Sequence, residues 1–96
     1  MTDIEVACAA AGDGWACSVR VREGGDTTEH EVAVRAAEAI AHGIMSVDDA
    51  ERLVSETFGF LLERESKASI LRTFDLDVVG RYFPEYEREI RRRLGR

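Results

Sequence analysis

The sequence predicts an α+β fold: a three-stranded antiparallel β-meander over residues 3–35, followed by three to four helices over residues 36–96 that pack on one face of the sheet. Three observations support this prediction. In the first third of the chain every second residue is apolar, which is typical of strands with one buried face. Two glycine-containing turns divide that third into three segments. From residue 36 the apolar spacing changes to three and four, as in helices. The length is that of a single domain, 1–96.

Each predicted strand has one apolar face. The apolar positions, strand by strand, are Ile4, Val6, Cys8 and Ala10, then Trp15, Cys17, Val19 and Val21, then His30, Val32 and Val34. A first hairpin with Asp13-Gly14 as its two-residue loop predicts a register in which Cys8 lies opposite Val19. A loop around Gly12-Asp13 would instead place Cys8 opposite Cys17. A second turn at Gly24-Gly25 leads into the third strand.

The main helix is predicted over residues 47–65. Ser46 and Asp49 form a capping-box pattern at its start. Met45 and Ala50 are spaced as a hydrophobic staple, so we expect them to pack on each other. The apolar residues of the segment form a broad stripe at helical spacing, which we expect to cover the apolar face of the sheet.

Three shorter helical patterns flank this helix. Residues 35–42 predict a short helix that ends at Gly43. A second pattern covers residues 68–83, as one helix or as two with a new start at Asp75. A last helix is predicted over residues 85–94. The strands and helices together predict a core of Val6, Trp15, Val19, Val32, Leu53, Val54, Phe58, Leu61, Leu71, Phe74, Val78 and Phe83.

Four short motifs lie in the C-terminal 40 residues: FLLERE at 60–65, SIL at 69–71, FDL at 74–76 and YFPEY at 82–86. Together they resemble a family of small prokaryotic proteins of unknown function. The resemblance implies a β-meander before the helical run, and it carries no activity, cofactor or catalytic residue.

The charge of the chain is unevenly placed. Six arginines and three glutamates between residues 81 and 96 give +3, so residues 1–80 carry −9 of the total of −6. Such a body repels phosphate backbones and anionic membranes, which disfavours nucleic acid and membrane as partners. The candidate basic arm is Arg88, Arg91, Arg92 and Arg93. Its charge would be largely neutralised if Glu87 paired with Arg91 and Glu89 with Arg93, both four residues apart.

The cellular location is predicted from segments that the chain lacks. The N-terminal residues show neither the basic region nor the apolar run of a signal peptide. No stretch approaches the roughly 18 apolar residues that span a bilayer. We therefore expect a cytoplasmic protein, in which both cysteines are reduced.

Few residues suggest chemistry. Cys8, Cys17 and His30 share one face of the predicted sheet and could suggest zinc, but a fourth ligand and the usual close cysteine spacing are absent. Buried free cysteines are the simpler interpretation. His30 and His42 are taken as structural, and the acidic clusters as helix caps. The sequence therefore predicts no catalytic residue, no metal and no cofactor.

The outer face of the predicted sheet is the candidate interaction surface. Its residues are Ala7, Ala9, Ala16, Ser18, Arg20 and Arg22. Cross-strand pairs with Glu5, Glu29 and Glu31 would account for the two arginines. Alanines at outward positions need more explanation, because exposed strands usually carry larger polar groups there. Either the C-terminal helix covers this end of the sheet, or a second subunit or another protein does.

These features lead to three hypotheses of function. The first is a non-enzymatic protein-interaction or regulatory module that binds a protein partner or itself. The second is a small enzyme or ligand-binding domain whose site forms on dimerisation, from His30, the cysteines, Glu29 and Glu31. The third is weak nucleic-acid contact through the C-terminal arginines. The sequence favours the first and leaves enzymatic activity undecided, though less favoured.

Overall fold

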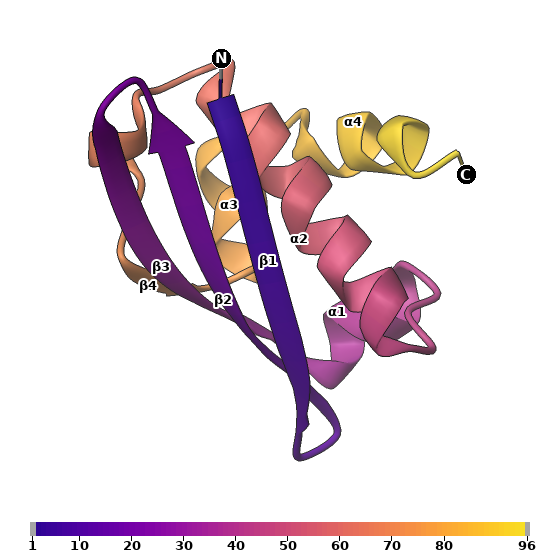
Figure 1. Ribbon diagram of the computed structural model, residues 1–96. Coiled ribbons are helices and arrows are strands. Elements are labelled where there is room, and N and C mark those ends of the chain that lie inside the picture. Colours follow the sequence, from indigo (N-terminus) through magenta and orange to yellow (C-terminus); the bar gives the residue numbers. More distant parts are fainter. Residues whose placement is uncertain (1, 96) are drawn as a thin grey trace.

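The computed structural model describes residues 2–95. Its sheet has four strands in the order β1-β2-β3-β4 (Figure 1). The strands β1 (Thr2–Ala11), β2 (Gly14–Glu23) and β3 (Asp26–Val34) form the predicted antiparallel meander. The short strand β4 (Thr73–Asp75) pairs with β3 in parallel, and the sequence did not predict it.

The helices lie on one side of the sheet, as predicted (Figure 1). They are α1 (Ala36–Ala41), α2 (Val47–Leu62), the short 3₁₀ helix η1 (Lys67–Ser69), α3 (Asp77–Tyr82) and α4 (Tyr86–Arg93). The long helix α2 packs along β1, and α4 packs on α2. The fold is therefore α+β, with a sheet layer and a helical layer.

The register of the first hairpin differs from the one that an Asp13-Gly14 loop predicts. The two loop residues are Gly12-Asp13, so Cys8 lies opposite Cys17. Gly12 has a φ of 60°, a left-handed conformation that glycine adopts without steric cost. A hairpin loop with its positive φ at the first position selects glycine there. Because the correction shifts the pairing by two residues, the same side chains still face the helices.

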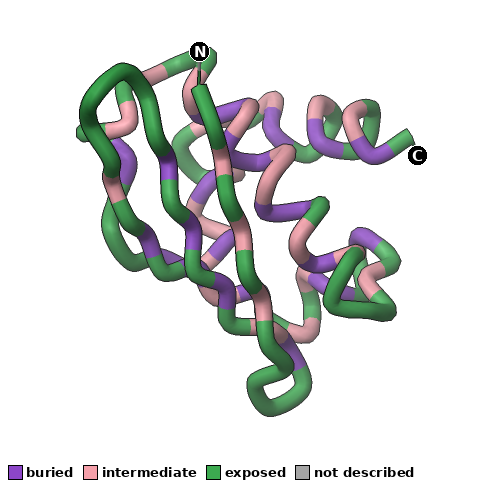
Figure 2. The backbone as a smooth tube through the Cα atoms, viewed as in Figure 1, coloured by how far each residue is buried: buried purple, intermediate pink, exposed green. Residues whose placement is uncertain are grey.

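The core lies between the sheet and α2. Buried and exposed residues alternate along β2 and β3, as Figure 2 shows. Of the predicted core residues, the structure buries Val19, Val32, Leu53, Val54, Phe58, Leu61 and Phe74. The predicted core residues that are only partly buried are Val6, Trp15, Val78 and Phe83. The prediction is wrong for Leu71, whose exposed fraction is 53%.

The predicted helix over residues 68–83 is replaced by an extended segment and the short α3. Residues 72–76 run along the free edge of β3, where Glu31 donates its N–H to the carbonyl of Arg72, and Leu76 donates to the carbonyl of Ala33. These hydrogen bonds pair backbone groups that would otherwise be free at the edge of β3. Local helical periodicity does not reveal such pairing. The extended segment turns Leu71 outward, and Tyr82 in α3 is 71% exposed.

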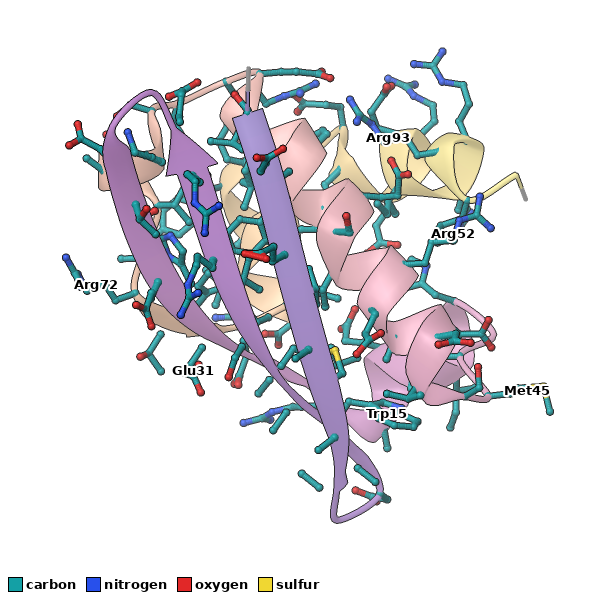
Figure 3. The ribbon with its side chains drawn as sticks, in the orientation of Figure 1. Trp15, Glu31, Met45, Arg52, Arg72 and Arg93 are labelled. Carbon is teal, nitrogen blue, oxygen red and sulfur yellow. A yellow bond between two sulfur atoms is a disulfide. The ribbon has the colours of Figure 1, made fainter. Side chains whose placement is uncertain are left out.

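The start of α2 is capped as predicted, but the expected staple is absent. The hydroxyl of Ser46 accepts a hydrogen bond from the N–H of Asp49, at 3.2 Å. The carboxylate of Asp49 accepts from the N–H of Met45, at 3.0 Å. The Met45 side chain extends away from the protein (Figure 3) and is 89% exposed, so it does not pack on the buried Ala50. The helix ends at Leu62, three residues before the predicted end.

Within residues 2–95, no helix is both long enough and apolar enough to cross a membrane.

Candidate functional site

The face of the sheet opposite the helices is uncovered within residues 2–95 (Figure 1). The predicted surface residues Ala7, Ala9, Ala16, Ser18, Arg20 and Arg22 are all exposed. The register places Ala9, Ala16 and Ala33 side by side across three strands, and Ala7 beside Ser18. We call these five residues the alanine patch.

The two arginines on this face pair with neighbouring strands, as the sequence predicts. Arg20 lies 3.9 Å from the carboxylate of Glu29, and Arg22 lies 3.7 Å from that of Glu5. All four side chains are at least half exposed. Exposed pairs of this kind stabilise a fold by about 0–1 kcal/mol each. The charged end of this face thus consists of exposed ion pairs, and the alanine patch is the part of the face that remains to be explained.

The C-terminal helix does not cover the alanine patch. Tyr86 of α4 is buried against the ring of Phe60, with 5.3 Å between the ring centroids. The Tyr86 hydroxyl lies 2.7 Å from the hydroxyl oxygen of Thr57, which itself donates to the carbonyl of Leu53. Because the Thr57 hydroxyl donates its proton to Leu53, the Tyr86 hydroxyl donates to Thr57, and burial raises the pKa of Tyr86. These contacts fix α4 on α2, on the other side of the molecule.

The candidate basic arm is partly neutralised by α2 and by its own helix. Arg93 pairs with Glu63 and Glu89, and Arg92 pairs with Glu89. The hydrogen bond from Arg92 holds the pKa of Glu89 below its usual value. The predicted pair of Glu89 with Arg93 is thus confirmed. The other expected pair is not formed within the described chain, because Glu87 turns instead toward His42.

Cys8 and Cys17 form a disulfide bond, so the prediction that both are reduced is wrong. The two ring nitrogens of His30 lie within hydrogen-bond distance of the Leu71 carbonyl, at 2.8 Å, and of the Thr28 hydroxyl, at 2.9 Å. Neither the sulfur atoms nor this ring can then serve as zinc ligands. His30 also lies on the opposite face of the sheet from the exposed Glu29 and Glu31, so the predicted parts of an enzyme site are not brought together in one protomer.

A different cluster joins α1 to α4. Single ligand atoms of Glu38, His42 and Glu87 all lie within 4.8 Å of one another. The sequence predicts a structural role for His42 and pairs Glu87 with Arg91, so it associates neither carboxylate with this histidine. The spacing of four between Glu38 and His42 was a local signal, because residues i and i+4 share a helix face. The approach of Glu87 gives no local signal, since it depends on how α4 packs.

An apolar groove of about 320 Å³ opens between the end of α2 and α3. Its rim includes the exposed Leu71 and Tyr82. The sequence predicts Leu71 in the core, and its exposure beside Tyr82 makes the groove a second candidate for protein contact.

No protein-family model, curated protein or solved structure matches this chain. The family resemblance of the four C-terminal motifs therefore stays a prediction.

Proposed function

We propose that this protein is a non-enzymatic interaction module that self-associates through the alanine patch. The observation that carries the proposal is an uncovered sheet face on which small side chains meet across three strands. Outward positions of an exposed sheet usually carry larger polar groups. Small side chains let a second sheet approach to the usual packing distance of about 10 Å.

The proposed occupant is a second copy of this chain. A two-fold axis perpendicular to the strands would place one alanine patch on the other. The same axis would direct Arg20 and Arg22 of the two copies toward opposite ends of the dimer, where they keep their pairs and their water. A two-fold interface needs only one self-complementary surface. Such a dimer would also increase the buried surface, because a domain of 96 residues buries a smaller fraction of its surface on folding than a larger domain does.

The second and third hypotheses have less support. The suggested parts of an enzyme site lie on opposite faces of the sheet. Two of the four arginines of the basic arm, Arg92 and Arg93, are paired with Glu89 and Glu63. The cytoplasmic location stays a prediction, and the disulfide of Cys8 and Cys17 weighs against it, because such bonds persist mainly in oxidising compartments.

Substituting the centre of the patch, Ala16→Arg, should convert a dimer to a monomer. The new guanidinium would be buried without a partner, which costs several kcal/mol, so the dissociation constant should rise by about 100-fold or more. Sedimentation equilibrium over a range of protein concentrations measures this change directly. Thermal unfolding at a concentration where the wild type is monomeric checks that the variant is folded.

The matched control is Tyr82→Arg, which adds the same charge at the apolar groove. This variant should dimerise like the wild type. A wild-type protein that stays monomeric at millimolar concentration would rule out self-association. A dimer that Tyr82→Arg dissociates and Ala16→Arg leaves intact would place the interface in the groove and contradict the proposal.

A further inference from the structure

The cluster of Glu38, His42 and Glu87 is held by well-fixed backbone. The N–H of His42 donates to the carbonyl of Glu38 at 3.1 Å, which sets the two residues one helical turn apart. Gly43, with a φ of 66°, ends α1 directly after His42. Glu87 is in the first turn of α4, next to Tyr86, which is buried and bonded to α2. Two of the three side chains thus come from one helix end, and the third comes from a docked helix.

Burial distinguishes the three side chains. The imidazole of His42 is almost completely buried, with 1% of its side chain exposed, and its Nε2 atom lies 3.6 Å from a carboxylate oxygen of Glu87. Glu38 is half-buried, whereas 49% of the Glu87 side chain is exposed. The cluster is therefore enclosed on the imidazole side and open to solvent beside Glu87.

A bound cation would offset the negative charges of the cluster. Burial raises the pKa of Glu38, and the negative charges of Glu87 and Asp77 raise it further. Two carboxylates at this separation repel each other, and the repulsion is strong where water is partly excluded. A dication between them would remove the repulsion and would use the nearby ring nitrogen as a third ligand.

We infer that Glu38, His42 and Glu87 bind one divalent first-row transition-metal ion, with Zn²⁺ preferred over Mg²⁺ and Ca²⁺. Imidazole suits zinc, whereas magnesium and calcium take oxygen ligands almost exclusively. Three protein ligands leave a fourth tetrahedral position, which a water molecule fills on the open side. This inference is independent of the proposed self-association.

The observed spacing is compatible with such a site. Ligands at about 2.0–2.2 Å from a tetrahedral zinc ion lie roughly 3.5 Å apart. The ligand atoms already lie within 4.8 Å of one another, and Glu87 is exposed enough for its side chain to rotate toward an ion. The competing interpretation is a contact of the His42 ring with the two carboxylates without any metal.

Zinc titration of the oxidised, full-length protein tests the inference. The disulfide keeps both sulfurs out of the titration as long as no reductant is added. Isothermal titration calorimetry should show one equivalent of Zn²⁺ bound and no comparable binding of Mg²⁺ or Ca²⁺. Substitution by Co²⁺ should produce visible absorption bands of a low-symmetry site, a signature that an ion pair alone does not produce.

The variants Glu87→Gln and Glu38→Gln should each weaken zinc binding by about 10–100-fold, because each replaces an anionic carboxylate with a neutral amide, a much weaker zinc ligand. The matched control Glu29→Gln makes the same change on the far face of the sheet and should bind zinc like the wild type. Far-ultraviolet circular dichroism of each variant should match that of the wild type, which shows that the variant is folded.

Two outcomes would overturn the inference. In the first, the wild type binds no Zn²⁺, or binds Mg²⁺ better than Zn²⁺. In the second, Glu87→Gln and Glu38→Gln bind zinc as tightly as Glu29→Gln does. In either case the cluster is a structural contact between α1 and α4 and not a zinc site.

Discussion

Replacing Phe58 with alanine should destabilise the protein by about 3–5 kcal/mol, which is the usual cost of deleting a buried aromatic ring. Phe58 is fully buried in α2. Its ring packs against His30 of β3, with 5.2 Å between the ring centroids, and against Phe74 of β4, at 6.1 Å. The substitution therefore opens a cavity where the helix, the meander and the added strand meet. Since small domains are stable by only about 5–15 kcal/mol, much of the total stability would be lost.

Leu71→Ala is the matched control for Phe58→Ala. The sequence places both residues in the core, whereas the structure exposes more than half of Leu71. Truncating an exposed side chain changes stability by about 0.5 kcal/mol or less. Urea unfolding followed by circular dichroism measures both changes. Similar losses of stability for the two variants would contradict the extended path of residues 70–75. An unchanged urea midpoint for Phe58→Ala would contradict the assignment of Phe58 to the buried face of α2.

The sequence predicts well those features that depend on neighbouring residues. The inward faces of β1, β2 and β3 follow from a period of two, and glycines mark both hairpins. The serine cap of α2 was predicted from its motif and is formed. In α4, the four-residue spacing of Tyr86, Ile90 and Leu94 predicts one face, and all three are buried.

Features that depend on distant residues were missed. Residues 73–75 form a strand because β3 presents a free edge to them, some 40 positions earlier in the chain. Their own spacing resembles a helix. The hairpin register was ambiguous for a related reason: loops at Gly12-Asp13 and Asp13-Gly14 both keep the apolar residues on one face. In the structure Cys8 pairs with Cys17, and Gly12 at the first loop position has the positive φ, which together identify the Gly12-Asp13 register.

The candidate sites follow the same division. The alanine patch could be predicted, because alternation along a strand shows which side chains point outward. The structure adds that α4 packs on α2 and leaves the patch uncovered. The cluster of Glu38, His42 and Glu87 can be predicted only in part, because Glu38 and His42 share a helix face whereas Glu87 belongs to another helix. Long-range packing decides such clusters, and periodicity does not report it.

Removing the disulfide with the double substitution Cys8→Ala and Cys17→Ala should destabilise the protein by about 2–3 kcal/mol. The bond closes a loop with a sequence separation of 9, and a loop of this size restricts the unfolded chain by about that free energy. For a domain near 100 residues, the loss corresponds to roughly 10–20 °C in melting temperature. Differential scanning calorimetry of the oxidised wild type and of the variant measures the difference.

A reductant provides the matched control. It should lower the melting temperature of the wild type toward that of the double variant and should leave the variant unchanged. If the reductant destabilises both proteins equally, its effect does not act through this bond. If oxidised wild type and variant melt together, the pairing of Cys8 with Cys17 contributes nothing to the fold.

Loss of the disulfide should also weaken self-association through the alanine patch, because the bond holds β1, which lies at the edge of the sheet. At Cys8 this strand is held by the bond to Cys17 and by a hydrogen bond from the Cys8 N–H to the carboxylate of Glu51, at 2.9 Å. Ala7 and Ala9 flank that point and form one side of the patch. A loosened β1 makes the patch less flat, so the dimer of the double variant should dissociate at lower protein concentration than the wild-type dimer. Equal dissociation constants would mean that the backbone pairing of β1 with β2 holds the patch without the disulfide.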